Sequence, residues 1–141
     1  MAKFSLDIED SNEPDFLLFG ISSHAKIYRL CWSLNQTMNL KLINSNSPIE
    51  LIEGRKKIKN SFELYTYYDE EMRISYNIIP NKAEQGFLLP EFKHVDYLFL
   101  LKENIDVDTN EIITQIRSSD QVLTAFTIQT QELKSLENLV F

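Results

Sequence analysis

Apolar and polar positions at the start of the chain predict two short strands followed by a helix. Residues 3–9 alternate between apolar and polar side chains, which is typical of a half-buried strand. A short apolar run at 15–20 predicts a second strand or a compact lead-in to the next element. Apolar side chains then recur with the helical period over 22–38, which predicts the longest helix of the protein.

This predicted helix has a wide apolar sector. Ser22 or Ser23 is placed to cap its N-terminus by accepting a backbone hydrogen bond. Cys31 falls in the core stripe, where a cysteine acts as a small buried hydrophobe more often than as a nucleophile. Tyr28 and Trp32 widen the stripe, so the helix is expected to pack on two sides, against its own fold or a partner. The two aromatic residues fit core packing, the floor of a ligand pocket or a dimer contact.

The middle of the chain predicts three strands and one irregular connection. The polar stretch 49–60 predicts the irregular connection. Tyrosines and β-branched residues dominate 61–68 and 72–79, which predicts two strands paired as a hairpin. Residues 94–101 are apolar on nearly every position, which is typical of a central strand.

The last third predicts a short helix, a strand and an apolar tail. Asp108 can cap the helix at 106–117, and residues 121–128 predict the strand. Strands therefore run in succession between two helices. This order predicts an α+β fold with a mixed or mainly antiparallel sheet of about five strands and two main helices on one face. Since no linker divides the chain, we expect a single domain over 1–141.

Composition and charge narrow the class of protein. The chain has 14 basic and 21 acidic residues, a net charge of −7, which argues against a protein built mainly to coat nucleic acid. No window approaches a membrane-spanning length of apolar residues, and the N-terminus lacks the apolar run of a secretory signal. The single cysteine cannot form an internal disulfide. We therefore expect a cytoplasmic protein without a membrane contact.

Common catalytic motifs do not occur in the sequence. It lacks a glycine-rich phosphate loop, a cysteine pair for zinc, a His-Glu-x-x-His pattern and a serine elbow. We therefore expect no cofactor and no metal, and no residue is assigned as catalytic.

Polar groups lie before and at the start of the predicted central strand, in the segment "LPEFKHVDY", residues 89–97. Pro90 forces the residue before it towards an extended backbone. Glu91, His94 and Asp96 could form an acid–base or metal set. The structural alternative is that Glu91 accepts backbone N–H groups in a turn and Asp96 anchors a neighbouring loop. We favour the structural alternative, because buried polar groups most often satisfy backbone groups.

His24 and Asn35 lie eleven residues apart and would share one side of the long helix. That side falls within the apolar sector, so both side chains are expected to be hydrogen-bonded or to border a pocket. A dyad of His24 with Asp96 or Glu91 is the functional alternative to a structural histidine.

A short basic run departs from the acidic character of the chain. Arg55, Lys56, Lys57 and Lys59 lie within five positions. They could contact phosphate of RNA or of a small anion, although such a run is usually a solvated loop.

The segment "LPEFKHVDY" also resembles the motif that names the IPExxxVDY family of small Bacteroidetes proteins. Pro90, Glu91, Val95, Asp96 and Tyr97 match the motif, and Leu89 stands in place of isoleucine. The stretch "GISSHAKIYRLCWSLN" and the ending "ENLVF" are similar to the same family. The resemblance implies a bacterial, cytoplasmic protein and no particular activity.

Together these patterns favour a non-catalytic binding or adaptor module. The wide apolar sector of the long helix and the apolar ending motivate a protein–protein contact, either a homodimer or a complex with another cytoplasmic protein. An RNA-associated accessory protein that uses residues 55–59 is the first alternative. An enzyme that uses His24, Glu91 and Asp96 is the second.

Overall fold

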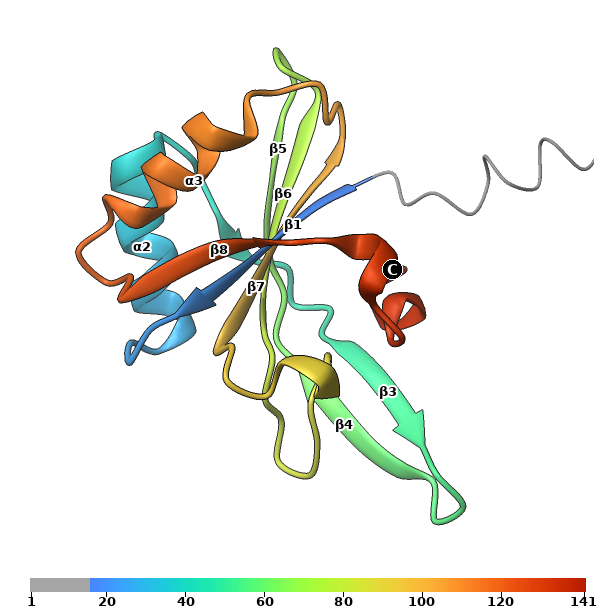
Figure 1. Ribbon diagram of the computed structural model, residues 1–141. Helices are drawn as coiled ribbons and strands as arrows, with labels where there is room; N and C mark the ends of the chain where they lie inside the picture. The colour runs from blue at the N-terminus through green and yellow to red at the C-terminus, as the bar shows by residue number, and fades with distance from the viewer. Residues whose placement is uncertain (1–15) are drawn as a thin grey trace, which may run out of the picture.

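A computed structural model describes residues 16–141, which form an α+β fold around one antiparallel sheet (Figure 1). The sheet has six strands in the order β2-β5-β6-β7-β1-β8, and a separate hairpin pairs β3 with β4. The strands are β1 (Phe16–Ser22), β2 (Ile43–Asn44), β3 (Ile49–Glu53), β4 (Ile58–Phe62), β5 (Tyr65–Asp69), β6 (Ile74–Pro80), β7 (Tyr97–Glu103) and β8 (Thr124–Ile128). The predicted fold class is confirmed, and the predicted strand at 3–9 lies outside the described residues.

The two helices, α2 (Ile27–Met38) and α3 (Thr109–Arg117), cover one side of the sheet, which we call the helix face (Figure 1). Side chains of α2 such as Leu30 and Leu34 pack there against Phe19 and Phe99 of the central strands. Asp108 caps α3 by accepting hydrogen bonds from the first-turn amides, as its position in the sequence predicted. The alternation of β1 and β7 thus directs every second side chain into this core.

The opposite side of the sheet, which we call the tail face, is covered by irregular structure. Leu18, Leu98 and Leu100 pack there against residues of the loop 81–96 and against Leu139 near the end of the chain. Three 3₁₀ turns belong to this cover: η1 (Pro90–Phe92), η2 (Thr130–Glu132) and η3 (Leu136–Leu139). Because both faces are covered, β7 is apolar on both sides, as expected for a central strand.

Three local predictions are wrong. The predicted strand at 61–68 is divided between the end of β4 and most of β5, with a break at 63–64. Residues 49–60 form the β3–β4 hairpin, which extends from the body of the molecule (Figure 1). The long helix begins later than predicted: its N-cap is Lys26, which makes no side-chain cap, so neither Ser22 nor Ser23 caps it. Ser22 instead ends β1, and Ser23 belongs to the connection between β1 and α2.

Candidate functional site

The segment 89–97 joins three distant parts of the chain. Pro90 opens η1, and Leu89 before it has the extended backbone that a following proline requires. Leu89 and Val95 are buried on the tail face, whereas Glu91, His94 and Asp96 are exposed. The polar side chains of this segment therefore lie at the surface of the core, and their hydrogen-bond partners show whether they are structural.

Glu91 holds the C-terminal segment. Its carboxylate accepts hydrogen bonds from the backbone N–H groups of Lys134 (2.7 Å) and Ser135 (3.0 Å), and from the Ser135 hydroxyl (2.7 Å). Partial burial acts to raise the pKa of Glu91, but the hydrogen bonds from Ser135 and Lys134 outweigh it and lower this pKa. The carboxylate accepts amides as the structural alternative requires, and the donors at 2.7 and 3.0 Å lie 43 and 44 positions away along the chain.

Asp96 and Tyr97 hold the connection between β1 and α2. The Asp96 carboxylate accepts the Ser23 backbone N–H at 2.9 Å, and the Tyr97 hydroxyl donates to the Ala25 carbonyl. Burial, and then the nearby Asp96 charge, raise the pKa of Tyr97 to about 12, so the hydroxyl keeps its proton. Asp96 precedes β7 and so is not a strand residue, but it does anchor a neighbouring loop as the structural alternative predicted.

Asn81, which the sequence did not single out, organises the loop beneath this segment. Its side chain has 0% exposure. Its Oδ1 accepts the Leu89 N–H at 2.7 Å, and its Nδ2 donates to the carbonyls of Phe92 (2.8 Å) and Val95 (3.1 Å). One amide thus pairs with three backbone groups, of which the Phe92 carbonyl also accepts the Val95 N–H. Asparagine after a strand is common in turns, so its position gave no distinguishing signal.

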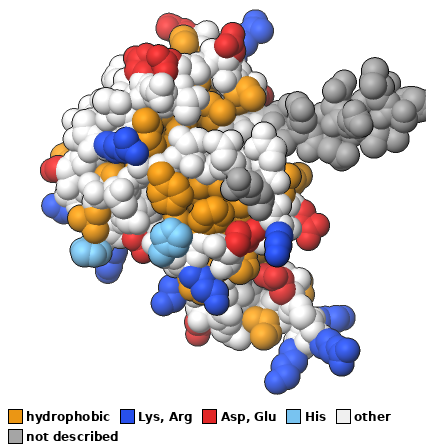
Figure 2. Space-filling view, in the orientation of Figure 1, with side chains coloured by type: hydrophobic (Ala, Val, Ile, Leu, Met, Phe, Trp, Pro, Cys, Tyr) orange, Lys and Arg blue, Asp and Glu red, His pale blue; other side chains and the backbone are white. Residues whose placement is uncertain are grey.

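The two histidines lie apart from a catalytic arrangement. His24 precedes α2 and does not share a helical side with Asn35, and Figure 2 shows the histidines as separate surface patches. Asn35 pairs with the main chain of Leu42 in both directions, which explains its place in the apolar sector. The His94 ring stacks on Phe126 with centroids 6.1 Å apart. Within residues 16–141, no group of three ligating side chains could hold a metal ion.

Cys31 is buried in the core between α2 and the sheet. Burial, and then the charge of Glu63, raise the pKa of its thiol to about 12. The thiolate that a nucleophilic cysteine needs is therefore scarce at neutral pH.

The outer side of α2 carries two exposed aromatic residues. Tyr28 is 60% exposed and Trp32 is 64% exposed, and they lie one helical turn apart. The apolar sector that the sequence indicated is therefore divided: Ile27, Leu30 and Leu34 face the core, while the aromatic flank faces outward.

The basic run occupies the tip of the β3–β4 hairpin. Arg55, Lys56 and Lys57 lie in its exposed turn, and Figure 2 shows basic side chains gathered at this end of the molecule. Lys59 pairs with Glu50 across the hairpin at 2.8 Å. A groove of about 740 Å³ between the hairpin and the loop 82–93 adds Lys82 and Lys93, together with the acidic Glu53 and Glu84.

Comparisons with protein-family models, curated proteins and solved structures gave no match. The resemblance of residues 89–97 to the IPExxxVDY motif therefore stays a prediction. No helix within residues 16–141 is long and apolar enough to cross a membrane.

Proposed function

We propose that the protein is a non-catalytic binding module whose contact surface is the outer side of α2, and that its first partner is a second copy of the same chain. The observation that carries this proposal is the exposure of Tyr28 and of Trp32, the sole tryptophan of the chain. Tryptophan and tyrosine are enriched among the residues that dominate binding energy at interfaces. Two exposed aromatic side chains one turn apart form a local apolar patch, which supports a surface that is covered in an assembly.

The surroundings of the aromatic pair fit such a contact. Exposed polar side chains, among them Arg29 and Gln36, lie on the same helix and can form the polar rim around an aromatic centre. In a two-fold dimer each copy contributes the same patch, so the Tyr28–Trp32 pair of one copy contacts the patch of the other. Burying both pairs would remove roughly 500 Å² of surface, less than the ~1,200 Å² of a typical stable interface. We therefore expect a concentration-dependent dimer.

The polar residues of the segment 89–97 support a non-catalytic role. The carboxylates of Glu91 and Asp96, the groups an enzyme would use, accept backbone N–H groups from the tail and from the β1–α2 connection. A general base must instead reach the proton of a substrate. The arrangement favours a structural role for these residues.

Trp32 provides the readout for the test. Because it is the sole tryptophan, its emission reports directly on the proposed contact. We expect the emission maximum to move to shorter wavelength as the protein concentration rises, and the Tyr28→Ala variant to abolish this shift. Tyr68→Ala is the matched control, since Tyr68 is an exposed tyrosine on β5. A concentration-independent emission of the purified protein would contradict the homodimer.

The basic hairpin favours a second candidate function, single-stranded RNA binding. Arg55, Lys56 and Lys57 at the tip, with Lys82 and Lys93 in the groove, supply basic side chains from two elements, and Glu53 and Glu84 lie among those of the groove. Five phosphate contacts would make the logarithm of the binding constant fall with that of the salt concentration, with a slope of about −3.5. A labelled 12-nucleotide RNA tests this by anisotropy.

In that experiment Lys82→Glu with Lys93→Glu should remove binding, whereas Lys41→Glu, an exposed lysine after α2, should leave it unchanged. Equal binding by these variants, or no binding by the wild-type protein at low salt, would eliminate the RNA candidate.

A further inference from the structure

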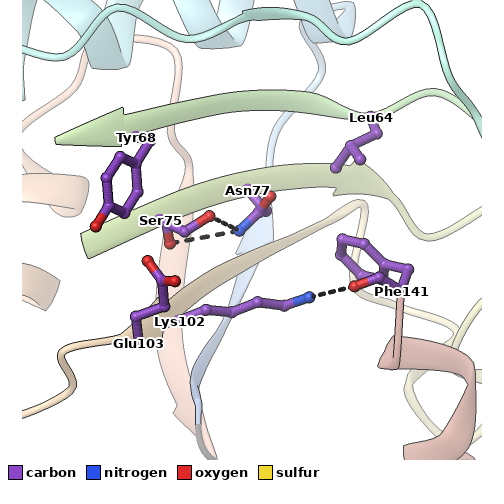
Figure 3. Close-up of a pocket in the computed structure, with 7 residues that line it drawn as sticks. All are labelled: Leu64, Tyr68, Ser75, Asn77, Lys102, Glu103 and Phe141. Atoms are coloured by element: carbon purple, nitrogen blue, oxygen red, sulfur yellow. Dashed lines mark hydrogen bonds between the residues drawn. The ribbon is translucent and has the colours of Figure 1, made fainter. Parts of the chain in front are cut away.

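A polar pocket lies on the tail face, across the sheet from α2 (Figure 3). Its volume is about 420 Å³, within the range of sites that hold small molecules. Three neighbouring strands supply the polar lining: Tyr68 from β5, Ser75 and Asn77 from β6, and Lys102 and Glu103 from β7. Leu64 adds an apolar wall. The pocket thus combines a cation, a hydroxyl and an amide on a rigid sheet.

Lys102 takes a position where the strand pattern would place an apolar side chain. Leu98 and Leu100 precede it on the same side of β7, and both are fully buried. Lys102 itself is partly buried, which lowers the pKa of its ammonium group. Lys102 lies directly across from Ser75 in the β6–β7 register. A partly buried cation beside a hydroxyl is a group that recognises anions.

Asn77 forms the floor of the pocket and is itself buried. Its Oδ1 accepts from the Thr66 hydroxyl at 3.0 Å, and its Nδ2 donates to the Ser75 hydroxyl oxygen at 3.1 Å. These bonds fix the orientation of the amide and of the Ser75 oxygen. Because that oxygen already accepts from Asn77, its own proton can be donated towards the pocket.

Phe141 lies over Lys102 and shows which chemistry the pocket accommodates (Figure 3). The Lys102 ammonium donates to the Phe141 main-chain oxygen at 3.2 Å and lies 3.5 Å from the centre of its ring. The tail is held before this point, by buried Leu139 and by the Asn138 amide on the Leu88 carbonyl. Phe141 remains 45% exposed, so it can leave the pocket without detaching the tail.

We propose that this pocket binds a small aromatic monocarboxylate, which displaces Phe141. The ligand's carboxylate takes the place of the Phe141 oxygen on Lys102, and its ring takes the place of the phenyl ring against the cation and Leu64. Glu103 at the rim places a second negative charge near the site, which disfavours dianions such as phosphates. The helices lie on the opposite face, so this site is independent of the proposed dimer contact.

The test is an NMR titration of the full chain with N-acetyl-L-phenylalanine and with its uncharged amide, N-acetyl-L-phenylalaninamide. The acid should shift the Asn77 side-chain resonances and the backbone amides of Ser75 and Lys102, and the amide should not. Phe141→Ala removes the ring of the internal competitor and keeps its main-chain oxygen, so it should strengthen binding of the acid about fivefold. Equal shifts with both probes, or no gain in Phe141→Ala, would overturn the proposal.

Substitutions of Lys102 complete the test. Lys102→Met should abolish binding of the acid, Lys102→Arg should keep it within a few-fold, and Lys41→Met should leave it unchanged. If Lys102→Met fails to fold, as judged by circular dichroism, two experiments still test the proposal. They are the comparison of the acid with the amide and the titration of Phe141→Ala. Binding that survives Lys102→Met in a folded protein would contradict the role of the cation.

Discussion

Replacing Glu91 by glutamine tests whether its carboxylate stabilises the fold by holding the C-terminal segment. The carboxylate accepts three hydrogen bonds from Lys134 and Ser135, all at 3.0 Å or shorter. Glutamine keeps one oxygen but turns an N–H₂ group towards backbone donors, so at least one bond is lost and the others lose their charge. Hydrogen bonds to a charged acceptor contribute about 1.5–3 kcal/mol in favourable cases, and the exposure of Glu91 reduces this. We expect a loss of about 1–2 kcal/mol in the free energy of unfolding.

The pH dependence of this loss separates a charge effect from a packing effect. The pKa of Glu91 is lowered on folding from its ordinary value of 4.5. The ionised carboxylate therefore stabilises the fold above about pH 4.5, and this stabilisation is lost as the pH falls through the folded pKa. The difference in free energy of unfolding between wild type and Glu91→Gln should be largest at pH 7 and should shrink by pH 3.

Urea denaturation followed by circular dichroism at both pH values measures this difference, and hydrogen exchange at the Lys134 and Ser135 amides measures local release of the tail. Glu84→Gln, at an exposed carboxylate on the loop 82–87, is the control. A Glu91→Gln variant within 0.5 kcal/mol of wild type at pH 7, with unchanged exchange at both amides, would refute the reasoning. The same loss at pH 3 as at pH 7 would refute the charge effect.

Three further substitutions or treatments test other contacts. Asn81→Ala should lower the free energy of unfolding by about 2–4 kcal/mol, because the Leu89 N–H and the Val95 carbonyl lose their partner and the Phe92 carbonyl loses one of two bonds; a loss below 1 kcal/mol in urea denaturation would contradict this. Tyr97→Phe should cost about 1 kcal/mol and speed hydrogen exchange at the start of α2, and unchanged exchange there would argue against the Ala25 contact. Cys31, whose thiol pKa is about 12, should stay unmodified by a thiol reagent at pH 8 until urea unfolds the protein; rapid modification of the native protein would show that the thiol is accessible.

Sequence patterns sufficed where the apolar residues of a segment match the faces that it buries. Tyrosines and β-branched residues predicted the pairing of β5 with β6. The apolar run predicted the central strand β7, and Asp108 predicted the start of the capped helix α3. In these elements the local preference and the tertiary environment agree, so the local pattern is informative.

The β3–β4 hairpin was missed because it extends away from the core. Only its base is buried, at Ile49 and Phe62, whereas Ile52 and Ile58 are exposed, so the period of two is short and weak. The hairpin is held by backbone pairing along its length and by the burial of Ile49 and Phe62 in the tail-face core at its base.

The start of α2 and the partner of Glu91 depend on contacts between residues far apart in the sequence. Asp96 and Tyr97 hold residues 23–25 out of the helix from more than seventy positions away, and Glu91 binds amides more than forty positions on. Reasoning on local pattern identified Glu91 and Asp96 as acceptors of backbone groups, but it could not identify which groups. The exposure of Trp32 was likewise undetermined, since core packing and a dimer contact require the same helical spacing.

Sedimentation velocity over a range of protein concentrations tests the proposed function most directly. We expect the wild-type protein to pass from monomer to dimer as its concentration rises, and the Trp32→Ala variant to stay monomeric with unchanged circular dichroism. A wild-type protein that stays strictly monomeric at the highest concentration, or a Trp32→Ala variant that dimerises as well as wild type, would contradict a self-association surface on α2.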